Sequence, residues 1–265
     1  MIFLEKLTAV ARVNNSWLCI GLDPEPEKLP QGVGVLEFCH AIIEATHDLV
    51  CAYKPNSAFF EALGAEGWAS LKSTIEAVPR NIPVILDAKR SDIGNTGRAY
   101  ARAAFDHLGA DAITVNPYMG YDSVEPFFEY RDKGVFILCR TSNPGSADFQ
   151  SLRCDGKSLY RVVAEKVGEW NKHGNLGLVV GATQPEELKD IRQSHPTLPL
   201  LIPGVGAQGG SLEQAVRYGA DVNGKLAIIN SSRQILYASS GPDYAAIARR
   251  VAQALRDEIN CYRTE

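Results

Sequence analysis

Short apolar runs alternate with longer segments of helical periodicity along almost the whole chain of 265 residues. Eight such runs occur, at residues 17–22, 51–54, 83–88, 112–116, 135–140, 176–180, 200–203 and 226–230. Most of them are apolar without alternation, which is typical of parallel strands that are covered on both faces. The average unit has about 30 residues, the size of one strand–helix crossover.

A helix is expected after each strand, because apolar residues recur there at helical spacing. The expected helices cover residues 35–50, 57–77, 93–108, 123–130, 158–172, 184–194, 211–218 and 244–259. Eight such units predict a closed (β/α)8 barrel, the TIM-barrel fold, as a single domain over residues 1–265 with an amphipathic helix before the first strand. A doubly wound open sheet is the alternative, but the turn after the first strand lacks the G-x-G-x-x-G pattern.

The composition is that of an ordinary globular protein, with 45% hydrophobic and 22% charged residues. A net charge of −4 provides no basic excess for nucleic acid or an anionic membrane, and no run of 18 apolar residues predicts a transmembrane helix. The cysteines have neither C-x-x-C nor zinc-finger spacing. We expect buried free thiols in a reducing cytoplasm, at Cys19, Cys39, Cys51, Cys139, Cys154 and Cys261.

In a barrel of this type, the functional residues lie at the carboxyl ends of the strands. The polar residues expected there are Asp23, Lys54, Asp87, Lys89, Ser142, Gln208 and Arg233. All five histidines fall in helices or at helix ends, so we expect surface positions and no histidine general base for His40, His47, His107, His173 and His195.

The block Asp87-Ala88-Lys89-Arg90-Ser91-Asp92 places acids on both sides of one lysine. Asp87 and Lys89 are two residues apart on an expected strand, so both point to the same side. An ammonium group between two carboxylates stays protonated, and it can donate a proton to carbon or stabilise a developing anion. The alternative is a solvated strand end with Asp92 capping the next helix, and the pattern alone leaves both open.

Four glycines occur within the seven residues 204–210, and an expected helix begins at Ser211. Glycines let the backbone approach a ligand closely, and the loops after the seventh and eighth strands bind phosphate in many barrels. Arg233, after the eighth strand, can add a fork of donors. The alternative is two tight turns with a surface arginine. The longest irregular stretch covers residues 141–157, and a loop of this length is often functional.

These segments together resemble the orotidine 5′-phosphate decarboxylase family over nearly the whole chain. The matching segments are Leu22-Asp23-Pro24, Lys54-Pro55-Asn56, residues 87–96, Arg140-Thr141-Ser142-Asn143-Pro144-Gly145, residues 203–210 and Ser232-Arg233. The long loop is similar to that of the larger subgroup, often called type 2. The resemblance implies an enzyme without metal or cofactor that converts orotidine 5′-monophosphate to UMP and CO₂ in de novo pyrimidine biosynthesis.

The resemblance also implies catalytic roles. Lys89 would protonate C6 of the pyrimidine, Asp87 and Asp92 would flank it, and Lys54 would complete an alternating Lys-Asp-Lys-Asp array. Asp92 and Thr96 would come from the neighbouring subunit of a homodimer. The implied binding residues are Asp23 and Lys54 for the ribose hydroxyls, Ser142 for the pyrimidine edge, Pro203 for the pocket wall, and Gln208 and Arg233 for the phosphate.

Two other functions remain as alternatives. One is a Mg²⁺-dependent sugar-phosphate decarboxylase or synthase of the same superfamily. Such enzymes carry a glutamate metal ligand at the end of the second strand, where this chain has Lys54, and a lysine repels a divalent cation. The other is a non-catalytic nucleotide binder, which would bind UMP tightly without decarboxylating the substrate.

Overall fold

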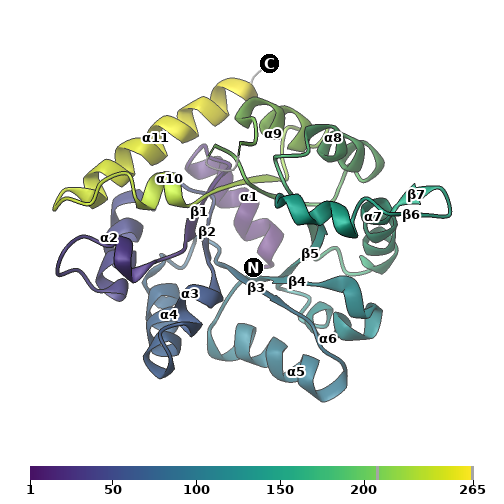
Figure 1. Ribbon diagram of the computed structural model, residues 1–265, viewed down its shortest axis with the longest axis horizontal. Coiled ribbons are helices and arrows are strands. Elements are labelled where there is room, and N and C mark those ends of the chain that lie inside the picture. Colours follow the sequence, from purple (N-terminus) through teal and green to yellow (C-terminus); the bar gives the residue numbers. More distant parts are fainter. Residues whose placement is uncertain (207–208, 264–265) are drawn as a thin grey trace.

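A computed structural model describes residues 1–206 and 209–263 (Figure 1). Eight parallel strands form one sheet in the order β2-β1-β10-β9-β8-β5-β4-β3. They are β1 (Leu18–Leu22), β2 (Ala52–Pro55), β3 (Ile85–Arg90), β4 (Ala112–Val115), β5 (Gly134–Arg140), β8 (Leu176–Val180), β9 (Leu200–Pro203) and β10 (Ala227–Ser231). Parallel bridges Tyr53–Val84 and Asn56–Asp87 join β2 to β3. The sheet therefore closes into the expected (β/α)8 barrel, and the open-sheet alternative is wrong.

Helices surround this barrel on the outside (Figure 1). They are α2 (Val35–Thr46), α3 (Ser57–Glu61), α4 (Ala65–Ala77), α5 (Gly94–Arg102), α6 (Glu125–Phe128), α7 (Leu159–Trp170), α8 (Pro185–Ser194), α9 (Leu212–Gly219), α10 (Arg233–Leu236) and α11 (Tyr244–Arg263). Within residues 1–206 and 209–263, no helix combines the length and the apolar character that crossing a membrane requires.

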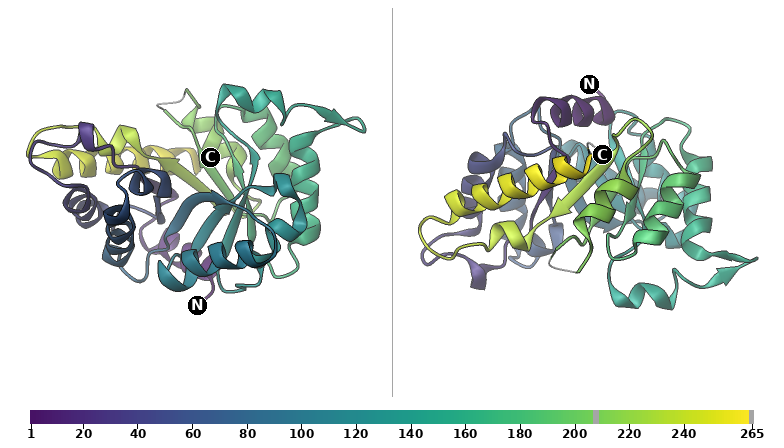
Figure 2. Two further views of the ribbon diagram at one scale, coloured as in Figure 1. Left: turned by 60° about the horizontal axis from the view of Figure 1, so that its bottom comes forward. Right: turned by 90° about the horizontal axis from the view of Figure 1, so that it is seen from above.

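The helix after β2 and the loop after β5 are among the segments that differ from the sequence prediction. The single helix expected over residues 57–77 is divided into α3 and α4, because Gly64 has a φ of +71° and breaks the helical backbone. The stretch 141–157, expected to be irregular, contains a 3₁₀ helix (Pro144–Asp148) and the short hairpin β6 (Arg153–Cys154)–β7 (Lys157–Ser158). Figure 2 shows this hairpin projecting away from the barrel.

The amino-terminal helix α1 (Phe3–Val13) closes the bottom of the barrel. In Figure 1 it lies across the middle of the ring of strands. Phe3 and Leu7 are buried against the barrel interior, and the ring of Phe3 lies 5.7 Å from that of Phe136. Lys6 forms an ion pair of 2.8 Å with Asp111. The amphipathic helix is thus confirmed, and it seals the amino ends of the strands.

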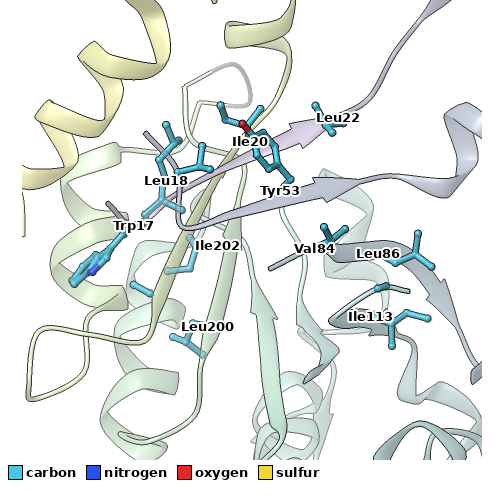
Figure 3. Packing of buried hydrophobic residues seen from close by; sticks show 14 of the residues in the cluster. Trp17, Leu18, Ile20, Leu22, Tyr53, Val84, Leu86, Ile113, Leu200 and Ile202 are labelled. Atoms are coloured by element: carbon cyan, nitrogen blue, oxygen red, sulfur yellow. The ribbon is translucent and has the colours of Figure 1, made fainter. Parts of the chain in front are cut away.

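Apolar strand residues fill the layer between the barrel and the helices (Figure 3). Four free cysteines lie in the interior: Cys19, Cys39, Cys51 and Cys139. Burial raises the pKa of both the Cys19 and the Cys39 thiols to about 12, so these groups stay protonated and inert. The expectation of burial is wrong for Cys154 and Cys261, which are exposed on the hairpin and on the last helix.

Candidate active site

A pocket of about 500 Å³ opens among the loops at the carboxyl ends of the strands. Its volume is typical of a site for a small molecule. The expected site residues that line it are Asp23, Lys54, Asp87, Lys89, Ser142, Pro203 and Arg233. They come from β1, β2, β3, β5, β9 and β10 and the loops that follow these strands. Barrel closure therefore brings together residues as far apart in the sequence as Asp23 and Arg233.

A chain of ion pairs connects the second and third strands at this pocket. The two carboxylate oxygens of Asp87 accept hydrogen bonds from different lysines, from Lys89 Nζ at 2.6 Å and from Lys54 Nζ at 2.9 Å. Lys54 and Asp87 are buried, whereas the side chain of Lys89 is 48% exposed towards the opening. Three of the four members of the expected Lys-Asp-Lys-Asp array therefore lie together within a single polypeptide chain.

Burial and charge act in opposite directions on the ionisation of this array. Burial lowers the pKa of Lys54, but the negative charges of Asp87 and Asp23 outweigh it and hold the pKa above the ordinary value of 10.5. Burial raises the pKa of Asp87, but the charges of Lys54 and Lys89 outweigh it and hold the pKa well below 3.8. At neutral pH the pocket thus contains a buried carboxylate that is held ionised by two cations.

Lys89 reaches the pocket through an irregular strand end. Its φ is +48°, in the left-handed region that is uncommon for residues other than glycine. The pairing of β3 with β4 shifts its register between Leu86 and Arg90, which marks a β-bulge. Asp87 and Lys89 both line the pocket as expected, but regular strand alternation does not explain how Lys89 reaches it.

Asp92 and Thr96 are placed differently from the other expected site residues. The Asp92 carboxylate accepts a hydrogen bond of 2.8 Å from the backbone N–H of Ile93, just before α5. Thr96 is exposed on α5. Within the described part of a single chain, neither of them lines the pocket, so Asp92 does not flank Lys89 there.

The loop after β5 is attached to the barrel by a buried cation. Arg140 is 3% exposed, and its Nε donates to Glu187 at 2.7 Å. Its Nη1 also donates to Gln150, whose Oε1 accepts a hydrogen bond of 2.8 Å from the backbone N–H of Thr141. These bonds position the neighbouring Ser142 at the edge of the pocket.

The glycine-rich loop after β9 makes tight turns with φ values that favour glycine, +97° at Gly204 and +64° at Gly206. The N–H of Gly210 donates to the carbonyl of Gly204 at 3.1 Å, so the loop returns to its own start. Gln208, an expected phosphate ligand, lies outside the described residues. Arg233 is exposed at the first position of α10 and borders the pocket.

Thr114 and Asn230 are among the polar pocket residues that the sequence interpretation did not assign. Thr114, in the middle of the apolar strand β4, is 1% exposed and donates a hydrogen bond of 2.9 Å to Asp87. Asn230, at the end of β10, has a buried Oδ1 without a partner in the described structure. The position of Asn230 near a strand end is a signal that could have identified it, whereas no such signal distinguishes Thr114 within its buried run. None of the five histidines lines the pocket, and no group of three or more His, Cys, Asp or Glu residues in the described chain has metal-site geometry.

Replacing Lys54 by methionine is expected to destabilise the fold by about 3 kcal/mol at pH 7, because it leaves the buried carboxylate of Asp87 with the half-exposed Lys89 as its remaining cation. Urea unfolding of both proteins measures this difference. Without Lys54 the pKa of Asp87 is higher, so the difference shrinks as the pH falls and Asp87 in the variant becomes neutral. A stability difference between the two proteins that does not change between pH 7 and pH 4 contradicts an ion pair between Lys54 and an ionised Asp87.

Comparison with known proteins identifies the family of this chain. The model of the "Orotidine 5'-phosphate decarboxylase / HUMPS family" matches residues 16–249. The chain belongs to this family. A relative named orotidine 5′-phosphate decarboxylase, from Dehalococcoides mccartyi (strain CBDB1), is 56% identical over 267 residues, with 99% of both chains covered. One of the same name from Herpetosiphon aurantiacus is 58% identical, with 95% of this chain and 96% of the relative covered.

Comparison with a solved structure supports the barrel fold. The structure described as Leishmania donovani OMP decarboxylase superimposes with a TM-score of 0.89 at 46% identity, with all of both chains covered.

Proposed function

We propose that this chain catalyses the decarboxylation of orotidine 5′-monophosphate to UMP and CO₂. The observation that carries the proposal is the Lys54–Asp87–Lys89 array of ion pairs in the strand-end pocket. A relative that bears the name of this activity is 56% identical and matches 99% of the chain, which supports it. The reaction is a carboxy-lyase step of pyrimidine biosynthesis.

In this reaction the bond between C6 of the pyrimidine and its carboxylate carbon breaks. The electron pair stays on C6 as the carboxylate leaves as CO₂. We assign to Lys89 the stabilisation of this carbanion by its positive charge and the transfer of a proton from Nζ to C6. The neutral amine then takes up a proton from solvent, which the 48% exposure of its side chain allows.

Asp87 is proposed to lie next to the substrate carboxylate. Two like charges about 4 Å apart repel by roughly 4 kcal/mol at an effective dielectric constant of 20. This repulsion disappears when CO₂ departs, so it favours the transition state over the bound substrate. The two lysines that hold the pKa of Asp87 low also keep it charged while the substrate binds.

The remaining pocket residues are assigned to the rest of the nucleotide. Asp23 and Lys54 hold the ribose hydroxyls, and one carboxylate oxygen of Asp23 is buried without a partner in the described structure. Ser142 binds the pyrimidine edge and Pro203 lines the wall. The guanidinium cation of Arg233, together with Gln208, binds the phosphate.

We propose that the reaction needs no metal or cofactor. The ammonium of Lys54, 2.9 Å from Asp87, lies where the Mg²⁺-dependent sugar-phosphate enzymes carry a ligand, and it would repel the ion. No observation favours that alternative or a binder without activity.

An ultraviolet assay tests the function. Purified protein, treated with EDTA, is mixed with orotidine 5′-monophosphate, and the loss of orotate absorbance is followed. Turnover that continues at the same rate after EDTA treatment supports a metal-free decarboxylase. Tight UMP binding without turnover refutes the proposal, and activity that returns only with Mg²⁺ refutes its metal-free mechanism.

We infer a homodimer in which Asp92 and Thr96 enter the pocket of the neighbouring subunit. In support, both lie outside the pocket of their own chain in the described structure. Ile93 between them is 53% exposed, and Tyr118 and Met119 are 80% and 50% exposed. Exposed apolar surface is a feature of protein–protein interfaces, which supports the inference.

The cytoplasm is the compartment proposed for this reaction. Cys19, Cys39, Cys51, Cys139 and Cys154 are free thiols, and the first four of them are buried. Free thiols persist in a reducing compartment, which supports the assignment.

Replacing Arg233 by alanine is expected to raise KM for orotidine 5′-monophosphate by roughly 100-fold, because a charge-assisted bond to the phosphate is lost. Steady-state kinetics measure the change. Arg80→Ala, a matched loss of one exposed arginine just before β3, is the control and should leave KM unchanged. An unchanged KM in Arg233→Ala contradicts the phosphate role.

A further inference from the structure

Thr114 makes more contacts to the ion-pair array than any role assigned so far explains. Its hydroxyl donates to Asp87 Oδ1 at 2.9 Å. The hydroxyl oxygen of Thr114 also accepts hydrogen bonds from the backbone N–H groups of Ala88 at 3.1 Å and Lys89 at 3.0 Å. A threonine hydroxyl has one proton and two lone pairs, so these three bonds use its full capacity.

The bulge in β3 creates the need for such a group. Leu86 pairs with Ile113 and Arg90 pairs with Val115, so residues 87–89 of β3 lie opposite the single residue Thr114 of β4. A bulge leaves backbone groups without a partner in the neighbouring strand. An unpaired N–H in a buried place costs free energy, and here a side chain provides the missing acceptor.

The same contacts affect the two groups that face the substrate. Lys89 has a φ of +48°, a conformation that persists only where its surroundings hold it. Asp87 Oδ1 is shared between Lys89 Nζ and Thr114, so the hydroxyl sets the orientation of the carboxylate as well as the backbone of the lysine. One buried atom of β4 thus connects the proton donor and the acid beside it.

We propose that Thr114 is a positioning residue that sets the geometry of Asp87 and Lys89 for proton transfer. It acts through these two residues on the reaction. The inference rests on the proposed function, because it assigns Lys89 as the proton donor. A small displacement of a donor from its reacting atom reduces kcat more than it reduces binding, since the distant phosphate and ribose contacts are unchanged.

Steady-state kinetics with three variants test the role. Thr114→Val keeps the shape but removes the hydroxyl, and we expect kcat to fall roughly 10- to 100-fold with KM within about threefold of wild type. Thr114→Ser restores the hydroxyl and is expected to keep kcat within about threefold. Thr46→Val removes another fully buried hydroxyl, which donates to the carbonyl of Ile42, and is the control that should leave kcat unchanged.

The outcomes separate this inference from the proposed function. A wild-type protein without turnover refutes the function. An active wild type with an unimpaired Thr114→Val variant, or with Thr114→Ser as impaired as Thr114→Val, refutes only the positioning role.

If Thr114→Val does not fold, amide hydrogen exchange of the wild-type protein and of Thr114→Ser tests the positioning role instead. Slow exchange at the N–H groups of Ala88 and Lys89, accelerated in Thr114→Ser by less than about tenfold, supports the proposal. Exchange as fast as in exposed loops overturns it.

Discussion

Replacing Lys89 by alanine abolishes decarboxylation, with an expected loss in kcat of at least about 10⁴-fold, while the protein keeps its fold. The loss is large because one ammonium group both stabilises the carbanion and donates the proton, and each of these effects contributes about 100-fold or more. The fold survives because Asp87 retains its hydrogen bonds to Lys54 and Thr114. The ultraviolet assay measures the rate, and thermal unfolding monitors the fold.

Lys72→Ala is the matched control, since it also removes one lysine, from an exposed ion pair with Glu76 on α4. It should leave the rate and the unfolding temperature unchanged. Calorimetry should show that Lys89→Ala still binds UMP, because the proposed phosphate and ribose contacts remain. Residual turnover within about 100-fold of wild type would remove Lys89 from the role of proton donor.

A mixed dimer of one Lys89→Ala chain and one Asp92→Ala chain is expected to be active, although each variant alone is nearly inactive. If Asp92 enters the neighbouring pocket, one of the two sites in the mixed dimer combines an intact Lys89 with an intact Asp92 of the partner subunit. The purified mixed dimer should then reach about half of the wild-type rate. Co-expression with two different affinity tags, followed by tandem purification and the ultraviolet assay, provides this measurement.

The reciprocal dimer is the matched control, made of one wild-type chain and one chain with both substitutions. It carries the same two changes, yet the proposed arrangement makes it inactive, because the wild-type Lys89 faces the substituted partner. If Asp92 acts within its own chain, the results are reversed, with the reciprocal dimer half active and the first mixed dimer inactive. That reversal contradicts the intersubunit site.

Most of the fold could be predicted from the sequence because hydrophobic patterns are local. Unbroken apolar runs such as 176–180 predicted buried parallel strands, and the structure has β8 at those residues. Where the prediction failed, a backbone conformation was responsible, as at Gly64, whose positive φ separates α3 from α4. A pattern of apolar residues does not contain that dihedral angle, and the apolar positions on both sides of the break have helical spacing.

The candidate site could be predicted in part, because polar residues at strand ends are conspicuous in an apolar sequence. Asp87 and Lys89 were identified in this way, and both line the pocket. Thr114 was missed, since its hydroxyl is in the middle of a run that is expected to be buried, and threonine is common in strands. The role of Thr114 depends on the bulge in the neighbouring strand β3. This bulge is a feature of the pairing between β3 and β4, which the sequence pattern of either strand does not contain.

The sequence by itself determined the residue types that the chemistry needs and the order of strands and helices that carries them, because apolar periodicity and the functional groups of side chains are properties of the residues themselves and their near neighbours. Only the tertiary structure decided that Lys54 and Lys89 share the two oxygens of Asp87, and that charge outweighs burial in setting the pKa values of Lys54 and Asp87. These properties depend on distances and solvent exclusion between segments far apart in the chain, which exist only once the barrel has closed.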